Sequence, residues 1–110
     1  MLIYKIFRPA EWDIFEASGV FDGSPDDKRD GFIHCSTADQ AAATAQRYFS
    51  GEPRLVIGVL DADKLEGDIR WEKASNGQLF PHIYRQLTRE DLVAVHDVAG
   101  AGQIEGALSL

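Results

Sequence analysis

The sequence predicts a single α+β domain with a compact, mostly antiparallel sheet, curved or split, and two main helices. Strand-like alternation recurs in short runs along the chain, whereas only two runs have helical spacing of their apolar residues. The two helical runs separate the early strands, and several strands then follow one another, an order typical of α+β domains. The chain has 110 residues, 45% hydrophobic and 26% charged, which are ordinary values for one globular domain.

The first half of the chain alternates strands and helices. Residues 2–7 alternate as a strand, and a short helix led by a proline follows over 9–18. Residues 22–27 have the glycine, proline and aspartate content of a loop. A short strand over 31–36 precedes a helix over 38–49, whose alanines recur at helical spacing and so predict a flat face against a sheet.

The second half is predicted to consist of strands. Residues 54–60 are apolar nearly throughout, so we expect this strand to be central in the sheet. Strands over 68–73 and 79–85 are joined by an Asn-Gly turn, which is a strong hairpin signal. Pro81 indicates an edge or a bulge in the second of them, and residues 92–96 form the last strand.

Domain boundaries and surroundings follow from glycine content, charge and cysteine count. We expect one domain over residues 1–98 and a glycine-rich, flexible tail over 99–110. The net charge of −7 disfavours non-specific nucleic-acid binding, although a local arginine still permits a compact phosphate-bearing ligand. The single cysteine fits a reducing compartment, and no apolar run approaches the ~18 residues of a membrane span. We therefore expect a cytoplasmic protein without a membrane partner, and its oligomeric state stays open.

Two segments carry the residues best suited to chemistry. In each, strand alternation places an aromatic ring, an imidazole and a hydroxyl on one face. The two rows are Phe32, His34 and Ser36, and Phe80, His82 and Tyr84. A ring offers a wall for stacking, an imidazole exchanges protons near neutral pH, and a hydroxyl orients a ligand or fixes a tautomer. We predict a cleft built around His34 and His82; a polar pair with a purely structural role is the alternative.

A carboxylate and a cysteine lie near these rows in the sequence. Arg70 and Glu72 share one strand face, with Trp71 on the other face and expected in the core. Glu72 could bond a sugar hydroxyl or stabilise a cationic transition state, whereas charge pattern alone favours a cross-strand ion pair. Cys35 points away from His34 and is expected to be a small buried hydrophobe. No ligand pair has metal spacing, so no metal site is predicted.

Several segments in a fixed order carry a family resemblance. They are Ile3-Tyr4-Lys5-Ile6 with Glu11-Trp12, Asp30 to Ser36 followed by Gln40, Trp71-Glu72, and Phe80 to Tyr84. On these segments the chain resembles the bacterial domain-of-unknown-function family 952 over nearly its whole length. At fold level that family is similar to the ADP-ribosyltransferase and RNA 2′-phosphotransferase group. Members of the group hold NAD or an ADP-ribose-like ligand in a cleft between two small sheets.

The resemblance implies roles for individual residues. His34 would bind the ligand ribose, with Ser36 orienting it, and Tyr84 or Phe80 would stack on nicotinamide. Glu72 would be the carboxylate that assists cleavage of the nicotinamide–ribose bond. NAD then enters as a candidate substrate, and no separate cofactor is predicted. We also expect two neighbours to contribute, Asp30 by bracing the His34 loop and Gln40 by facing the same cleft.

The sequence is therefore compatible with three functions. The first is a protein that binds or acts on NAD or an ADP-ribose-like nucleotide, with ADP-ribosyltransferase-like or NAD-cleaving activity. The second is a non-enzymatic module that binds a metabolite or a protein. The third is a two-histidine phosphoesterase, in which His34 and His82 serve as acid and base.

Overall fold

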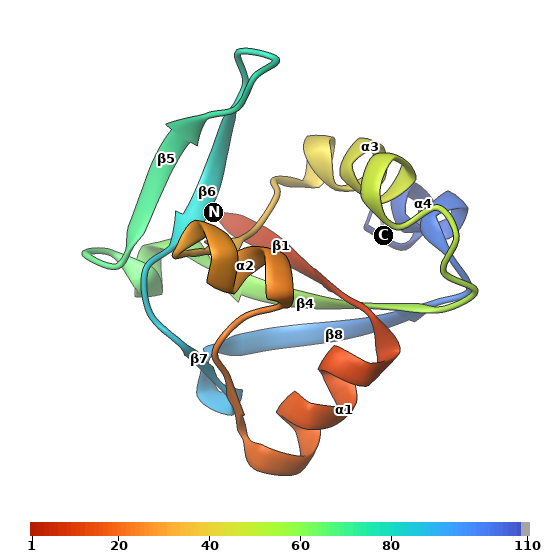
Figure 1. Cartoon of the computed structure of the whole chain (residues 1–110), viewed down its shortest axis with the longest axis horizontal. Coiled ribbons are helices and arrows are strands. Elements are labelled where there is room, and N and C mark those ends of the chain that lie inside the picture. The colour runs from red at the N-terminus through yellow and green to blue at the C-terminus, as the bar shows by residue number, and fades with distance from the viewer. Residues whose placement is uncertain (109–110) are drawn as a thin grey trace.

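Antiparallel sheets assembled from distant parts of the chain form the frame of the molecule (Figure 1). A computed structural model describes residues 1–108. Its first sheet has the order β1 (Leu2–Phe7), β4 (Leu55–Asp61), β8 (Leu92–Val98). Its second has the order β3 (Ile33–His34), β6 (Leu79–Ile83), β5 (Ile69–Lys73), and a small ladder pairs β2 (Val20–Phe21) with β7 (Leu87–Thr88). All these pairings are antiparallel, which confirms the predicted α+β class.

Helices cover both faces of the first sheet. The α-helices are α1 (Pro9–Ser18), α2 (Pro25–Asp30), α3 (Ala38–Tyr48) and α4 (Ile104–Leu108). Short 3-10 turns are η1 (Ala62–Leu65), η2 (Arg89–Asp91) and η3 (Ala101–Gln103). In Figure 1, α3 and α4 lie together at one side of the sheet and α1 lies at the other. Within residues 1–108, no helix is long and apolar enough to cross a membrane.

The alternation of β1 divides the buried side chains between two cores. Ile3 and Phe7 pack with the apolar residues of α1 and of the second sheet, whereas Tyr4 and Ile6 pack under α3 and α4. The predicted alanine face is confirmed, because Ala41 and Ala45 are fully buried in the second of these cores. The six residues from Leu55 to Leu60 are all buried, as expected for a central strand covered on both faces.

The segment expected to be a loop over 22–27 instead begins a helix. Ser24 accepts a hydrogen bond from the backbone N–H of Asp27, and Asp27 accepts one from the backbone N–H of Ser24. With Pro25 at the first helical position, this capping box starts α2. The Ser-Pro-x-Asp pattern was the available signal, and it outweighs the loop-like composition of the segment.

Two further expectations in the second sheet were wrong. Pro81 lies in the central strand of that sheet, where its carbonyl accepts a hydrogen bond from the backbone N–H of Cys35 at 3.1 Å. Its missing N–H is tolerated because β3 pairs with β6 only at Ile33 and His34. Trp71 is 38% exposed rather than in the core, because the outer half of the β5–β6 hairpin extends beyond the first sheet (Figure 1).

The C-terminal segment, expected as a flexible tail over 99–110, packs on the body of the protein as far as the structure describes it. η3 and α4 place Ala101 and Ile104 in the core beneath α3, and Ile104 is completely buried. Burial of these two side chains explains why the segment stays packed against the domain instead of extending into solvent. Residues 109 and 110 lie outside the described part of the chain.

Candidate functional site

A cleft of about 350 Å³ lies among β1, α2, α3 and the tip of the β5–β6 hairpin. Small-molecule sites in proteins usually occupy roughly 300–1,000 Å³. Both predicted histidines line the cleft, together with Gln40, Ser36 and Phe80 from the predicted set. The fold therefore brings most of the predicted side chains, Asp30 included, to one cavity, whereas Phe32, Glu72 and Tyr84 are not among its lining residues.

Asp27, a residue that the sequence analysis did not select, fixes His34. Its Oδ1 lies 2.6 Å from His34 Nδ1 and accepts a hydrogen bond from the backbone N–H of His34 at 3.1 Å. Its Oδ2 accepts hydrogen bonds from Lys5 Nζ at 2.8 Å and from the backbone N–H of Ser24 at 2.9 Å. One carboxylate thus joins β1, the start of α2 and β3.

Asp27 and Lys5 form a buried ion pair, with side chains only 2% and 5% exposed. Burial by itself would raise the pKa of Asp27, but hydrogen bonds from neighbouring side chains and the charge of Lys5 outweigh burial. The pKa of this carboxyl is therefore held far below its usual range. Asp27 is consequently an anion that holds the His34 ring in place throughout the neutral pH range.

Asp30 faces the other nitrogen of the same ring. Its Oδ2 lies 2.9 Å from His34 Nε2, and the hydrogen bond from Arg29 is the main reason that the pKa of Asp30 is lowered. The Asp30 side chain is one-third exposed, so this carboxylate is accessible from the cleft. The predicted bracing of His34 by Asp30 corresponds to this contact.

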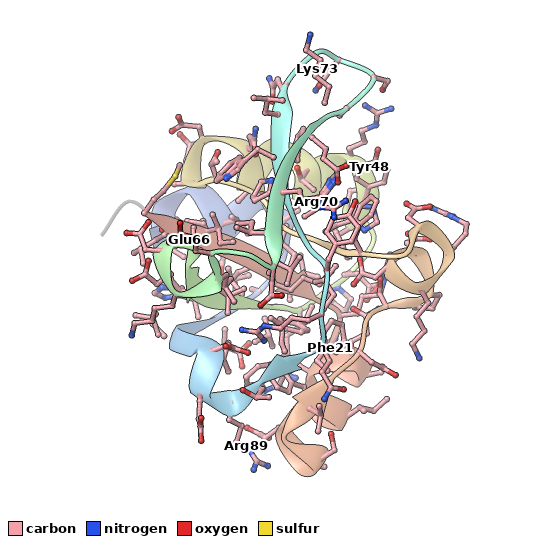
Figure 2. The ribbon with its side chains drawn as sticks, turned by 90° about the vertical axis from the view of Figure 1, so that its left-hand side faces the viewer. Phe21, Tyr48, Glu66, Arg70, Lys73 and Arg89 are labelled. Carbon is pink, nitrogen blue, oxygen red and sulfur yellow. The ribbon has the colours of Figure 1, made fainter. Side chains whose placement is uncertain are left out.

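His82 is held in a similar way by Glu72. Glu72 Oε1 lies 2.8 Å from His82 Nδ1 and accepts a hydrogen bond from the Tyr84 hydroxyl. These two hydrogen bonds, the one from Tyr84 first, lower the pKa of Glu72, and the same contact raises the pKa of Tyr84. The guanidinium of Arg70 lies 4.5 Å from the Tyr84 ring. Figure 2 shows Arg70 part-way along β5 and Lys73 near the hairpin tip.

Phe32 covers one face of His82. The two rings stack with centroids 3.9 Å apart and an interplanar angle of 15°. The Phe32 ring also lies 4.7 Å from His34 and 5.4 Å from Tyr84, so it links both predicted rows. It restricts His82 to a single orientation toward the cleft.

The two histidines are direct cross-strand partners. His34 on β3 is opposite His82 on β6, and their ring centroids are 5.5 Å apart. Each ring has a carboxylate at Nδ1, which comes from α2 for His34 and from β5 for His82. Two carboxylate–imidazole pairs thus meet on adjacent strands at one wall of the cleft, an arrangement suited to moving protons.

The other predicted residues have different surroundings. Ser36 does not orient His34: its hydroxyl donates to Thr44 at 3.4 Å, and its backbone pairs with Tyr4 to connect the two sheets. Gln40 accepts from the backbone N–H of Thr37 and donates to the Leu79 carbonyl at 2.8 Å, so it ties α3 to the hairpin. Ser36 and Gln40 therefore shape the cleft wall as well as lining it.

Basic side chains at the cleft were missed by the sequence analysis. Arg8, Arg29 and Arg47 all line it. Arg8 stacks 4.5 Å from the Phe49 ring, donates to the Tyr48 carbonyl and lies 3.5 Å from Glu11, whereas Arg29 pairs with acidic neighbours on α2. Their positions in three different elements left no local motif in the sequence.

Cys35 is confirmed as a small buried residue, and its side chain packs in the apolar core. Burial raises the pKa of its thiol to about 12, so it is not a nucleophile at neutral pH. Within residues 1–108, no group of three or more His, Cys, Asp or Glu side chains is arranged to hold a metal ion.

Fold and site together define a small α+β protein in which two antiparallel sheets carry a histidine-lined cleft. The chain belongs to the family described as "Protein of unknown function (DUF952)", whose model matches residues 6–95. No curated protein matches the chain.

Solved structures of protein CC0527 from Caulobacter crescentus are similar to this chain. The crystal structure is 40% identical, covers 100% of both chains and has a TM-score of 0.92. The solution NMR structure is 43% identical over 89% of this chain and 84% of that chain, with a TM-score of 0.80. The whole fold, including the hairpin and the C-terminal segment, is therefore shared with CC0527.

Proposed function

We propose that the cleft binds a nucleotide-type ligand, with NAD or an ADP-ribose-like nucleotide as the first candidate. One observation carries the proposal: the paired His34 and His82 face a cavity that also collects arginines from separate elements. Such a cavity offers partners for sugar hydroxyls at its histidine wall, formed by His34 and His82. It offers partners for phosphate at its arginine wall, formed by Arg8 and Arg47.

The hydroxyl partners lie around His34. Ribose hydroxyls both donate and accept hydrogen bonds, so a carboxylate beside an imidazole suits them. Asp30 is the accessible carboxylate here, with Oδ2 beside His34 Nε2. A ribose that enters the cleft would replace or share this contact.

The phosphate partners lie near the end of α3. Arg8 is held by stacking on Phe49, and the Arg47 guanidinium lies 5.3 Å from the Tyr48 ring. Planar guanidinium groups match phosphate oxygens in pairs, and stacking restricts their orientation before the ligand binds. Arg47 carries positive charge at this end of the cleft, and its attraction for a phosphate a few ångströms away is little screened, so the net charge of −7 does not prevent phosphate binding there.

Binding has stronger support than cleavage of the nicotinamide–ribose bond. That cleavage needs a carboxylate at the cleft wall to stabilise the oxocarbenium-like transition state. Glu72, the carboxylate expected for this role, is absent from the cleft lining and is bonded to His82. Asp27 and Asp30 line the cavity, but Asp27 is buried in its pair with Lys5 and both already contact the His34 ring. We therefore propose Glu72 as a positioning residue for His82.

Isothermal titration calorimetry with ADP-ribose, NAD and phosphate-free adenosine tests the proposal. We expect ADP-ribose and NAD to bind more tightly than adenosine. His34→Ala and Arg47→Ala should each weaken ADP-ribose by about tenfold or more, the effect of losing a charge-assisted hydrogen bond. His96→Ala is the matched control, because His96 lies on β8 and does not line the cleft. Absence of binding, or equal affinities for all variants, would refute the proposal.

A further inference from the structure

We propose that His34 and His82 act as a general acid–base pair that hydrolyses the phosphodiester of a cyclic nucleotide bound in the cleft, with His82 as the base and His34 as the acid. This inference rests on the proposed nucleotide site and adds a reaction to it. It depends on a difference between the two imidazoles. His82 has a carboxylate at Nδ1 alone, whereas His34 has a carboxylate at each ring nitrogen.

His82 presents a proton acceptor to the cleft. Glu72 Oε1 is 2.8 Å from Nδ1, so the proton of the neutral ring lies on Nδ1 and the lone pair lies on Nε2. No side chain or backbone group of residues 1–108 hydrogen-bonds Nε2, and that part of the chain has no buried side-chain nitrogen or oxygen without a partner. His82 Nε2 is therefore open to the cavity that the ring lines.

His34 presents a proton donor. Carboxylate oxygens lie 2.6 Å from its Nδ1 and 2.9 Å from its Nε2, so the protonated form of the ring has an acceptor for each of its N–H groups. Asp27 is buried and fixed, whereas Asp30 is accessible. A ligand oxygen can therefore take the place of Asp30 beside Nε2 without disturbing the Asp27 contact.

The spacing of the rings fits one phosphate group. Their centroids are 5.5 Å apart, and the attacking and leaving oxygens of a phosphoryl transfer lie on opposite sides of phosphorus. Two groups that hydrogen-bond these oxygens must therefore be separate but close. Stacking with Phe32 and pairing across β3 and β6 keep both rings in place.

The reaction uses water as the only co-reactant. His82 Nε2 takes a proton from the water whose oxygen bonds to phosphorus. The phosphorus–oxygen bond to the leaving group breaks, its electron pair stays on the leaving oxygen, and His34 Nε2 donates a proton to that oxygen. The products are a phosphomonoester and a free hydroxyl, and proton exchange with solvent restores both rings.

Several charged groups face the two rings or the carboxylates that hold them. Asp27 and Asp30 of α2 face His34 directly, and Lys5 of β1 reaches it through Asp27. Glu72 of β5 faces His82, with Tyr84 hydrogen-bonded to the same carboxylate and Arg70 paired across the strands with His82. The pH dependence of the reaction should respond to changes at these residues.

The test uses the full chain with adenosine 2′,3′-cyclic phosphate, with phosphorus NMR detecting the ring-opened monophosphate. We expect a bell-shaped pH–rate profile. His82→Gln and His34→Gln should each lower the rate by about 100-fold or more, the usual contribution of general acid–base catalysis. His82→Gln should also remove the rise at low pH and His34→Gln the fall at high pH, whereas His96→Gln should match the wild type.

Further variants separate a catalytic role from loss of folding. Tyr84→Phe and Glu72→Gln both retain the two histidine side chains. We expect each variant to bind the cyclic nucleotide but to shift the rising limb of the pH–rate profile. Wild-type protein that binds the cyclic nucleotide without opening it would overturn the acid–base inference and leave the nucleotide site standing. Wild-type protein that binds neither this compound nor ADP-ribose would overturn both.

Discussion

Asp27 links His34 of the cleft to the buried frame of the protein. One carboxylate oxygen of Asp27 contacts both the ring Nδ1 of His34, at 2.6 Å, and its backbone N–H, at 3.1 Å. The other oxygen holds Lys5 and the start of α2. The position of the cleft histidine is therefore set by an ion pair that also holds the fold together.

Asp27→Asn should strongly destabilise the protein. The substitution leaves the buried Lys5 ammonium without its anion, and breaking such a pair usually costs about 3–5 kcal/mol. Urea denaturation measures the effect. Asp97→Asn is the control, because its ion pair with Arg54 lies on the surface and should hardly affect stability. An Asp27→Asn variant as stable as the wild type would contradict the assigned role of the ion pair.

The same carboxylate should make stability fall in acid. The pKa of Asp27 is lower in the folded protein than its ordinary value of 3.8, so the folded state favours the anion. Its stabilising contribution is therefore complete above that ordinary value and is lost as the pH falls below it. Thermal unfolding followed from neutral to acid pH should show this loss in the wild type and a shallower one in Asp27→Asn. If stability fell equally with pH in the wild type and in Asp27→Asn, the result would argue against a lowered pKa for Asp27.

Tyr84 should be slow to ionise as the pH is raised. The hydrogen bond to Glu72, followed by desolvation, raises the pKa of Tyr84, so tyrosinate absorbance should contain a component at unusually high pH. In Glu72→Gln this component should move to lower pH, and in Tyr84→Phe it should disappear. A tyrosinate curve that Glu72→Gln leaves unchanged would show that the two side chains are not in contact in solution.

Ile104→Ala tests the C-terminal packing. Ile104 is completely buried under α3, and removing such a side chain usually costs about 2–5 kcal/mol. Val93→Ala is the matched control, because Val93 is 53% exposed on β8 and should change the unfolding free energy little. Equal unfolding midpoints for the two variants would mean that α4 does not belong to the core.

The sequence predicted most of the regular structure and half of the site for one physical reason. Period-two alternation identified β1, a continuous apolar run identified β4, and an Asn-Gly turn identified the β5–β6 hairpin. Alternation also placed His34 and His82 on faces that meet across β3 and β6. Alternation reports on local geometry only. It cannot reveal that Lys5 and Asp27, which are 22 positions apart, form a buried pair.

The errors concern residues whose environment depends on tertiary packing. Trp71 has the alternation of a core residue but is 38% exposed on β5, an edge strand of the second sheet. Ile104 comes after a stretch with four glycine or alanine residues over 99–102 and resembles a flexible tail in sequence, yet it fills space beneath α3. By contrast, α2 had a local signal, because Ser24, Pro25 and Asp27 form a capping box.

Nitrogen NMR of the histidine rings in the full chain tests the central claim most directly. The claim is that a nucleotide binds between His34, His82 and the arginine wall of the cleft. Added ADP-ribose should shift the ring nitrogens of His34 and His82 in a saturable manner and leave those of His96 unchanged. If millimolar ADP-ribose shifts neither cleft ring, or shifts all three histidines alike, the proposed nucleotide site is contradicted.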